Sequence, residues 1–330
     1  MPKRDKSEKS STGNRPQTEQ GMITRVSSRS VQVWMPSTET SLRCTLRGKL
    51  WAADRGETRP VAAGDRVNVV VDGDVGVVES VHERHNRLAR PQAFGTFSGR
   101  TRHKQGRVAP VQVIAANLDR LIVVAALEEP PFRPGLVDRF CVAADMQGID
   151  AVVVLNKADL PCDRSVADPY IEAGLTVIQT SIMTGEGIAE LGTLMSKGIS
   201  LLVGHSGVGK SSLLNAVSPD LKLSVGHVAT YHGRGRHTTT TVTLLRLDNG
   251  GWVVDSPGMR EFALEDVPPA VLARLYPGFE ELPRDCRFSN CRHNTEPGCA
   301  VVEAVEDGRY PEERYEIYLR ILDEVSEGGT

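Results

Sequence analysis

The sequence predicts a multidomain fold: an N-terminal five-stranded β-barrel of the oligonucleotide-binding (OB) type, a central α/β domain with a mostly parallel sheet, and a small helical C-terminal module. Three observations carry this prediction. Short strands broken by turns fill residues 21–90, apolar strands alternate with helices after residue 108, and cysteines cluster near the C-terminus. We expect a disordered tail at 1–20, the barrel with a basic linker at 21–107, the α/β domain at 108–265 and the module at 266–330.

Composition excludes several classes of protein. The 330 residues are 40% hydrophobic and 25% charged, which is ordinary for a globular chain. The longest strongly apolar run, Leu121–Leu127, is far too short to span a bilayer. No apolar segment follows the N-terminal lysines and arginines, so we expect no secretory signal. The prediction is a cytoplasmic monomer without a membrane partner.

Charge is distributed unevenly along the chain. The formal net charge of −3 by itself argues against a nucleic-acid partner. Residues 1–107, however, hold 20 Lys and Arg against 11 Asp and Glu, a net of +9, which leaves −12 for residues 108–330. This asymmetry indicates a basic N-terminal part that faces a polyanion.

The N-terminal part consists of a tail and a barrel. Met1–Gln20 has no large apolar residue after Met1, which favours a disordered basic tail. Five strands within about 65 residues then favour the OB-type barrel. Asp72-Gly73 marks a hairpin turn. The expected strands are Gly21–Val26, Ser30–Trp34, Ser41–Leu46, Asp65–Val71 and Val75–Val81.

The segment after the barrel combines positive charge with aromatic rings. His82–Arg107 contains seven Arg and Lys and one acidic residue, with Phe94 and Phe97 between them. Such a mixture suits RNA that offers phosphates together with unstacked bases. A solvated basic linker is the alternative interpretation.

The central part alternates apolar strands and helices, the pattern of a parallel sheet covered on both faces. The expected helices include Leu136–Gln147 and Ile188–Lys197. The expected strands are Val111–Ala116, Leu121–Ala126, Ala151–Leu155, Leu175–Thr180 and Ile199–Val203.

A phosphate-binding loop follows the last of these strands. Gly204-His205-Ser206-Gly207-Val208-Gly209-Lys210-Ser211 matches G-x-x-x-x-G-K-[ST] and precedes the expected helix Ser211–Val217. Backbone N–H groups and the helix N-terminus form the anion site of such a loop. We expect Lys210 to contact the β- and γ-phosphates and Ser211 to bind Mg²⁺, with Ser212 completing the nucleotide contacts.

Two further motifs are expected beside the γ-phosphate. The hairpin of Leu244–Leu247 and Trp252–Val254 ends in Asp255-Ser256-Pro257-Gly258, where Asp255 fits a Mg²⁺ carboxylate and the Gly258 N–H a γ-phosphate sensor. The Gly- and Arg-rich loop Gly233–Thr241 runs into threonines. We favour Thr239 as a Mg²⁺ ligand that orders with the nucleotide, and the neighbouring threonines are alternatives.

A fourth motif selects the base. Asn156-Lys157-Ala158-Asp159 resembles the N-K-x-D motif of GTPases, in which the Asp carboxylate accepts both N–H donors on the Watson–Crick edge of guanine. Ser181, in Thr180-Ser181-Ile182, resembles the accompanying base-supporting loop. Asp159 therefore argues against the alternative that the protein is an ATP-dependent enzyme.

The order of the motifs is rotated. GTPases normally run from the phosphate loop to N-K-x-D, whereas here Asn156–Asp159 comes first. The chain resembles the circularly permuted GTPases, and specifically the RsgA-type family of bacterial GTPases that mature the small ribosomal subunit. His205 departs from the expected Gln. The resemblance also rests on Arg84-x-x-Arg87-Leu88-x-Arg90-Pro91, Gly235-x-His237-Thr238-Thr239 and the cysteine cluster.

The resemblance implies a GTP-hydrolysing assembly factor that binds the small ribosomal subunit and its rRNA late in maturation. The subunit would stimulate hydrolysis and the GDP form would leave. Lys210 and Thr239 are the expected catalytic residues. Met259 stands where many small GTPases place the Gln that positions water, so His237 is our hypothesis for that role. The alternative is an RNA-binding regulator that uses GTP as a slow structural switch.

The C-terminal cysteines have metal-ligand spacing. Cys286, Cys291, His293 and Cys299 form C-x₄-C-x-H-x₅-C. Three thiolates and an imidazole make a closed, structural Zn²⁺ site, because no position is left for water. An intracellular chain keeps its thiols reduced, which disfavours a disulfide. RNA contact at this cluster is a further hypothesis, since three arginines lie in it: Arg284, Arg287 and Arg292.

Overall fold

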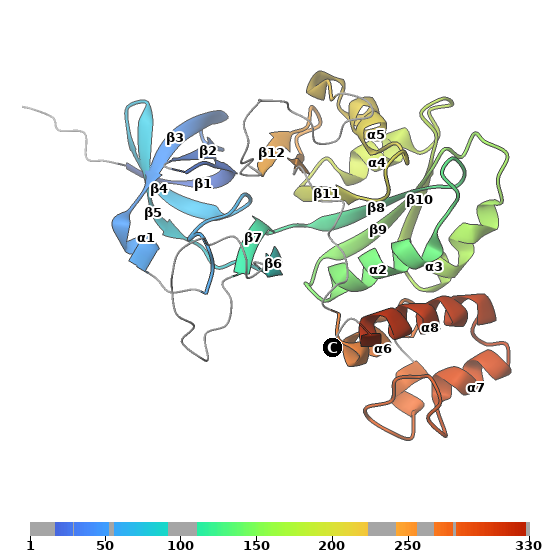
Figure 1. The fold of residues 1–330 in the computed structure, drawn as a ribbon. Helices are drawn as coiled ribbons and strands as arrows, with labels where there is room; N and C mark the ends of the chain where they lie inside the picture. Colours follow the sequence, from blue (N-terminus) through green and yellow to red (C-terminus); the bar gives the residue numbers. More distant parts are fainter. Residues whose placement is uncertain are drawn as a thin grey trace, which may run out of the picture.

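The computed structural model describes residues 17–28, 30–52, 56–91, 111–223, 242–255, 267–279 and 282–327. Figure 1 shows a barrel at one side, an α/β domain beside it, and a helical module packed against the α/β domain. Most of the expected tail lies outside the described residues.

The N-terminal part is a closed five-stranded barrel, as expected from the sequence. Antiparallel pairs and one parallel pair, β3–β5, close the ring in the order β1-β2-β3-β5-β4-β1. Side chains of alternate residues fill its interior, with Ile23, Val33 and Val69 fully buried. The elements are β1 (Gln17–Val26), β2 (Val31–Met35), β3 (Thr40–Leu46), α1 (Gly48–Ala52), β4 (Arg66–Asp72) and β5 (Val75–Val81).

The first strand begins earlier than the sequence suggested. Gln17–Gln20, which we placed in the disordered tail, belong to β1 and pair with Asn68–Val71 of β4. The backbone N–H and C=O groups of β4 need partners for the barrel to close, and polar side chains on the partner strand do not prevent that pairing.

A two-stranded sheet connects the barrel to the α/β domain. β6 (Arg87–Pro91) pairs antiparallel with β7 (Val111–Ala116). We expected Val111–Ala116 within the parallel sheet, and this was wrong. An apolar run predicts a buried strand but does not identify the strand that it pairs with.

The central sheet has the order β10-β9-β8-β11-β13-β12 and is parallel except for β12. Alternate residues of its strands face two separate cores. Leu121 and Val123 of β8 pack with the α2 side, whereas Ile122 and Val124 pack with α4 and α5. The strands are β8 (Arg120–Ala126), β9 (Asp150–Asn156), β10 (Thr176–Thr180), β11 (Ile199–Val203), β12 (Thr243–Arg246) and β13 (Trp252–Asp255). The helices are α2 (Pro134–Asp145), α3 (Asp168–Glu172), α4 (Ile188–Leu194) and α5 (Lys210–Val217).

The barrel joins the central sheet directly. β1 pairs antiparallel with β12 at Arg25 and Thr243, so that the barrel strand extends the sheet. Beside this contact, the rings of Trp34 and Trp252 meet edge to face at 5.4 Å. The Arg246 guanidinium lies 4.4 Å from the centre of the Trp34 ring.

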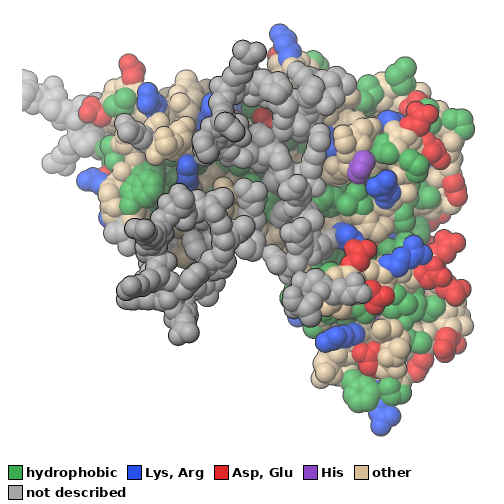
Figure 2. All heavy atoms as spheres, in the orientation of Figure 1, with side chains coloured by type: hydrophobic (Ala, Val, Ile, Leu, Met, Phe, Trp, Pro, Cys, Tyr) green, Lys and Arg blue, Asp and Glu red, His purple; other side chains and the backbone are tan. Residues whose placement is uncertain are grey.

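The C-terminal module is built on aromatic side chains. Tyr276, Phe279 and Tyr318 are fully buried and pack together against the α2 residue Val142. Figure 2 shows Asp and Glu side chains gathered along the rim of this module. Its helices are α6 (Pro269–Leu275), α7 (Ala300–Glu306) and α8 (Glu312–Glu327). Within the described ranges, no helix is both long enough and apolar enough to cross a membrane.

Candidate nucleotide and metal sites

The phosphate loop joins β11 to α5, and its path requires glycine. Gly204 and Gly209 have φ values of 138° and 98°. A Cβ atom at Gly204 would lie 2.0 Å from the Val124 carbonyl oxygen, and one at Gly209 would lie 2.3 Å from the Asn156 side-chain nitrogen. The loop therefore packs directly against the ends of β8 and β9, where no other residue type fits.

Lys210 lies across the loop that precedes it. Its Nζ donates hydrogen bonds of 2.8 Å to the carbonyl oxygens of Gly204 and His205. Ser211 is buried in the first turn of α5. The ammonium and the helix N-terminus thus converge on the space that the loop encloses, which is the arrangement that binds phosphate.

Asn156 connects three loops at this edge of the sheet. It is buried at the end of β9, and its Nδ2 donates to the Val208 carbonyl at 2.8 Å. Its Oδ1 accepts a 3.0 Å hydrogen bond from the Thr180 hydroxyl. The next residue, Lys157, has φ of 63°, and its Nζ donates to the Glu129 carbonyl. Asn156 and Lys157 therefore hold the loops together.

Asp159 and Ser181 lie side by side, as the base-binding motif requires. The Ser181 hydroxyl donates to Asp159 Oδ1 at 2.5 Å. Ser181 is fully buried, whereas Asp159 is exposed at the rim. The exposed carboxylate can accept hydrogen bonds from a ligand, and the buried serine fixes its position.

Asp255 ends β13, which is parallel to β11. Carboxyl ends of parallel neighbours meet at one edge, so Asp255 and the phosphate loop lie at the same edge of the sheet. On the side of β13 away from β11, Asp255 pairs with Thr243 of β12, the residue that also pairs with Arg25 of the barrel. Burial raises the pKa of Asp255, because desolvation penalises the charged form of the carboxylate.

Three other expected site residues, His237, Thr239 and Gly258, lie outside the described residues.

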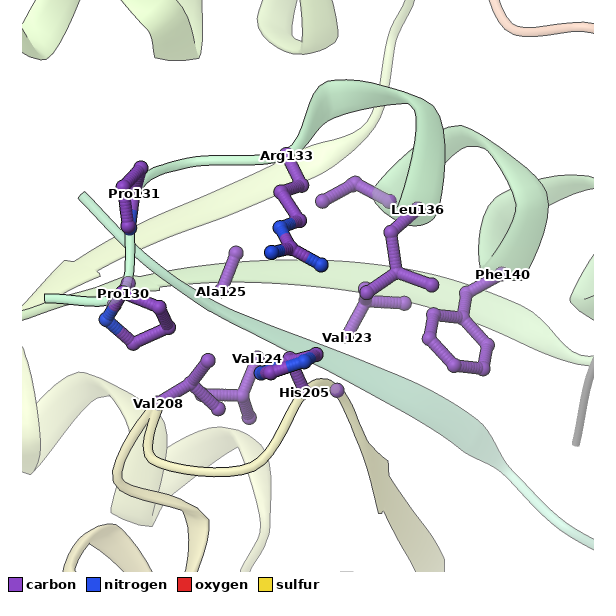
Figure 3. Close-up of a pocket in the computed structure, with 13 residues that line it drawn as sticks. Val123, Val124, Ala125, Pro130, Pro131, Arg133, Leu136, Phe140, His205 and Val208 are labelled. Carbon is purple, nitrogen blue, oxygen red and sulfur yellow. The ribbon is translucent and has the colours of Figure 1, made fainter. Parts of the chain in front are cut away.

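An apolar pocket adjoins the phosphate loop (Figure 3). It lies between β8, the start of α2 and the loop, and Val124, Phe140 and Val208 are among the side chains that line it. Arg133 and His205 extend into it from opposite sides (Figure 3). Arg133 has no signature in the sequence, because one arginine before a helix forms no distinctive pattern.

The Cys and His cluster has the geometry of a metal site. The four ligand atoms of Cys286, Cys291, His293 and Cys299 lie within 4.8 Å of one another. The Cys286 and Cys299 sulfurs are 4.0 Å apart, and His293 Nδ1 is 3.5 Å and 3.4 Å from them. Tetrahedral Zn²⁺ with bonds of about 2.3 Å to sulfur and about 2.0 Å to nitrogen would separate such atoms by about 3.5–3.8 Å. The four residues therefore fit zinc.

Hydrogen bonds from α8 hold the loop of this cluster. The Tyr315 hydroxyl donates to the His293 carbonyl at 2.8 Å, and the Tyr318 hydroxyl donates to the Arg292 carbonyl. Burial lowers the pKa of His293, which favours the neutral imidazole that a metal requires. Burial also raises the pKa of Cys291 to about 12. A cation is therefore needed to hold this thiol as a thiolate.

Arg84, in the sequence after the barrel, has a structural role that its motif did not reveal. Its guanidinium is largely buried and binds Asp65 at 2.6 Å and 2.9 Å. It also donates to both carboxylate oxygens of Glu57 at 2.9 Å. Arg84 therefore fastens the linker to the barrel.

Comparisons with known proteins agree with this geometry. The family model described as RsgA GTPase matches residues 81–265. The chain is 38% identical to the small ribosomal subunit biogenesis GTPase RsgA of Gemmatimonas aurantiaca, over 89% of this chain and 94% of that protein. It is also 38% identical to the protein of the same name from Moorella thermoacetica, over 86% of this chain and 89% of that protein.

Solved structures give the same result. The crystal structure of YjeQ from Thermotoga maritima matches with a TM-score of 0.75 and 33% identity, over 94% of this chain and 99% of that one. YloQ, described as a circularly permuted GTPase, matches with a TM-score of 0.71 and 26% identity over 96% and 97%. The chain therefore belongs to the RsgA GTPase family and is a circularly permuted GTPase that uses guanine nucleotide and Mg²⁺.

Proposed function

We propose that this GTPase binds the small ribosomal subunit and its ribosomal RNA late in assembly, that the subunit stimulates hydrolysis, and that the GDP form leaves. The observation that carries the proposal is the row Arg25–Thr243–Asp255, which runs from the barrel across β12 to the nucleotide edge. Binding of a polyanion to the barrel can thereby change the position of residues at the nucleotide site. Two relatives are named small ribosomal subunit biogenesis GTPase, which supports the small subunit as that polyanion.

Within this proposal the nucleotide residues have separate tasks. Asp159 reads guanine with support from Ser181, and the loop Gly204–Ser212 holds the phosphates through its backbone and Lys210. Ser211, Asp255 and Thr239 share Mg²⁺, and the Gly258 N–H senses the γ-phosphate. His237 positions the attacking water in place of the Gln that Met259 replaces. Cys286, Cys291, His293 and Cys299 hold one structural Zn²⁺.

The barrel is the proposed RNA-binding surface. Its exposed cations include Arg25, Arg43 and Arg66 on three different strands. Contacts between arginine and phosphate release counterions, so subunit binding should weaken steeply with salt.

The test is GTP hydrolysis titrated with purified small subunits at several salt concentrations, with large subunits as the control. We expect turnover to rise with small subunits only, and the rise to disappear as salt increases. Unchanged turnover together with salt-dependent binding would instead establish the slow-switch regulator. Met259 is the observation that favours that alternative, because a thioether cannot orient water.

A further inference from the structure

A closed ring of hydrogen bonds joins the two loops that flank the proposed guanine site. Arg164 Nη2 donates to the Ala158 carbonyl at 2.8 Å, and its Nη1 and Nη2 donate to the two Glu186 carboxylate oxygens at 2.7 Å and 3.0 Å. The Glu186 carbonyl accepts from the Ser181 N–H at 3.0 Å. Ser181 returns to the first loop through its 2.5 Å bond to Asp159, next to Ala158.

The protein fixes the positions of both side chains that form this ring, Arg164 and Glu186. Arg164 opens a 3-10 helix (Arg164–Ala167) whose start is fixed by Asp163, which accepts from the Ser165 N–H at 2.9 Å. Ala167 at the end of that helix is buried in the core. On the other side, Gly187 packs so tightly that a Cβ atom there would lie 2.1 Å from the Gln179 carbonyl oxygen.

The chemistry of the ring requires arginine. One planar guanidinium satisfies two carboxylate oxygens and a carbonyl simultaneously, which the single ammonium of lysine cannot do in the same plane. Arg164 also lowers the pKa of Glu186, mainly through its side-chain hydrogen bonds, so the carboxylate stays ionised. The pair is partly exposed, and its effect therefore comes from the ring geometry more than from charge attraction.

We propose that Arg164 is a positioning residue for guanine selection. It locks the N-K-x-D loop to the base-supporting loop, so that Asp159 and Ser181 meet the base already in place. Without the Arg164 bonds, nucleotide binding must order two loops that the ring already holds, which lowers the affinity. The Asp159 carboxylate also loses its fixed direction toward the exocyclic amino group of guanine. This inference rests on the proposed role of Asp159.

The test uses full-length Arg164→Ala and Arg164→Lys variants and compares GTP, GDP and ITP, since inosine lacks the 2-amino group. We expect GTP and GDP affinity to fall by about three- to tenfold in both variants, with a smaller loss for ITP. The KM for GTP should rise while kcat stays near the wild-type value, because the ring lies at the base and not at the phosphates. Arg320→Ala is the matched control: it removes another exposed arginine, paired with Glu316 on α8, and should change none of these quantities.

The outcomes separate this inference from the site on which it rests. A wild-type ratio of GTP to ITP affinity in both Arg164 variants, with wild-type melting temperatures, would overturn it. Asp159→Asn should abolish the preference for GTP over ITP. If Asp159→Asn keeps that preference, the guanine site itself is wrong; if only the Arg164 variants keep it, Arg164 forms a surface ion pair and nothing more.

Discussion

At the scale of single residues, several polar side chains of the nucleotide motifs form hydrogen bonds to other parts of the protein and thereby hold the loops of the site in place. Asn156 belongs to the N-K-x-D motif, yet both ends of its side chain bind other loops of the protein. Ser181 likewise bonds Asp159. Such buried groups are costly to leave unpaired, so their partners are fixed before any ligand arrives.

This makes Asn156 a sensitive position. Asn156→Ala would leave the buried Val208 carbonyl and Thr180 hydroxyl without their partner, and we expect a loss of about 1–3 kcal/mol in unfolding free energy. GTP affinity should fall as well, since the phosphate loop loses its tie to β9. Urea denaturation and nucleotide titration measure the two effects.

Asn215 supplies the control for that prediction. It also makes two side-chain hydrogen bonds, to the backbone of Leu223 at 2.7 Å and 2.8 Å, and among the described residues neither bond reaches a nucleotide motif. Asn215→Ala should lower stability without lowering GTP affinity. Equal GTP affinity in the two variants would contradict a nucleotide-specific role for Asn156.

At the scale of elements, the C-terminal module is tied to the GTPase domain through α2 and α8. Arg314 of α8 donates to buried Asp138 of α2 at 2.8 Å, and Tyr276 donates to the other Asp138 oxygen at 2.6 Å. The Arg314 guanidinium also lies 4.5 Å from the centre of the Tyr170 ring. Desolvation raises the pKa of Asp138, and Arg314 opposes that rise.

A buried ion pair of this kind is costly to break from one side. Asp138→Leu should destabilise the protein by about 3–5 kcal/mol, because it leaves the Arg314 charge buried without a counterion. The double variant Asp138→Leu/Arg314→Met should recover most of that loss. Thermal denaturation of both variants is the measurement, and a double variant no more stable than the single one would contradict this account.

With the proposed Zn²⁺ bound, the Cys and His cluster would stabilise the same module from its other end. Its ligands bracket a loop that α8 holds through Tyr315 and Tyr318. Chelation, or Cys299→Ser, should therefore release zinc and lower the melting temperature of the module. Guanine-nucleotide binding should persist, because the described phosphate loop and base-binding residues do not contact the cluster. Zinc content by mass spectrometry and nucleotide titration distinguish the two effects; loss of nucleotide binding would show that the module supports the GTPase fold.

At the scale of the whole molecule, the barrel and the GTPase sheet form one continuous hydrogen-bonded surface. β1 adds to β12, and the stack of Trp34, Trp252 and Arg246 lies beside that contact. Through the linker, Asn86 donates to the Leu118 carbonyl at 2.7 Å and to the Gly148 carbonyl at 3.1 Å. The barrel is thus held at two separate places.

If the β1–β12 contact and the stack beside it transmit barrel binding to the nucleotide site, weakening this joint should uncouple subunit binding from hydrolysis. Trp34→Ala should reduce hydrolysis stimulated by small subunits while leaving the basal rate intact, because the ring contacts given for Trp34 within the described residues are with Trp252 and Arg246 and not with a nucleotide motif. Trp51→Ala is the control, since Trp51 lies on α1 of the same barrel, is 57% exposed and is not part of the stack of Trp34, Trp252 and Arg246. Equal stimulation in the two variants would contradict the coupling.

Much of the site was predictable from sequence because its chemistry is encoded in short segments. The glycines of Gly204–Gly209 are required by the backbone path of the loop itself. The spacing of Cys286–Cys299 brings four ligands together within fourteen consecutive residues. Short strands broken by turns, with a hairpin signal at Asp72-Gly73, likewise predicted the barrel strands.

Other features depended on residues far apart in the chain. The sequence by itself determined which chemical groups this protein carries: a phosphate loop and a guanine motif in permuted order, a Cys and His cluster with metal-ligand spacing, and a barrel. Only the tertiary structure decided that Gln17–Gln20 close the barrel, that β7 pairs with β6, that Arg164 locks the base loops and that Asp138 meets Arg314, 176 residues away. The physical reason is that local patterns constrain backbone shape and burial, whereas the partner of a buried charge or a strand edge is chosen by the packing of the whole chain.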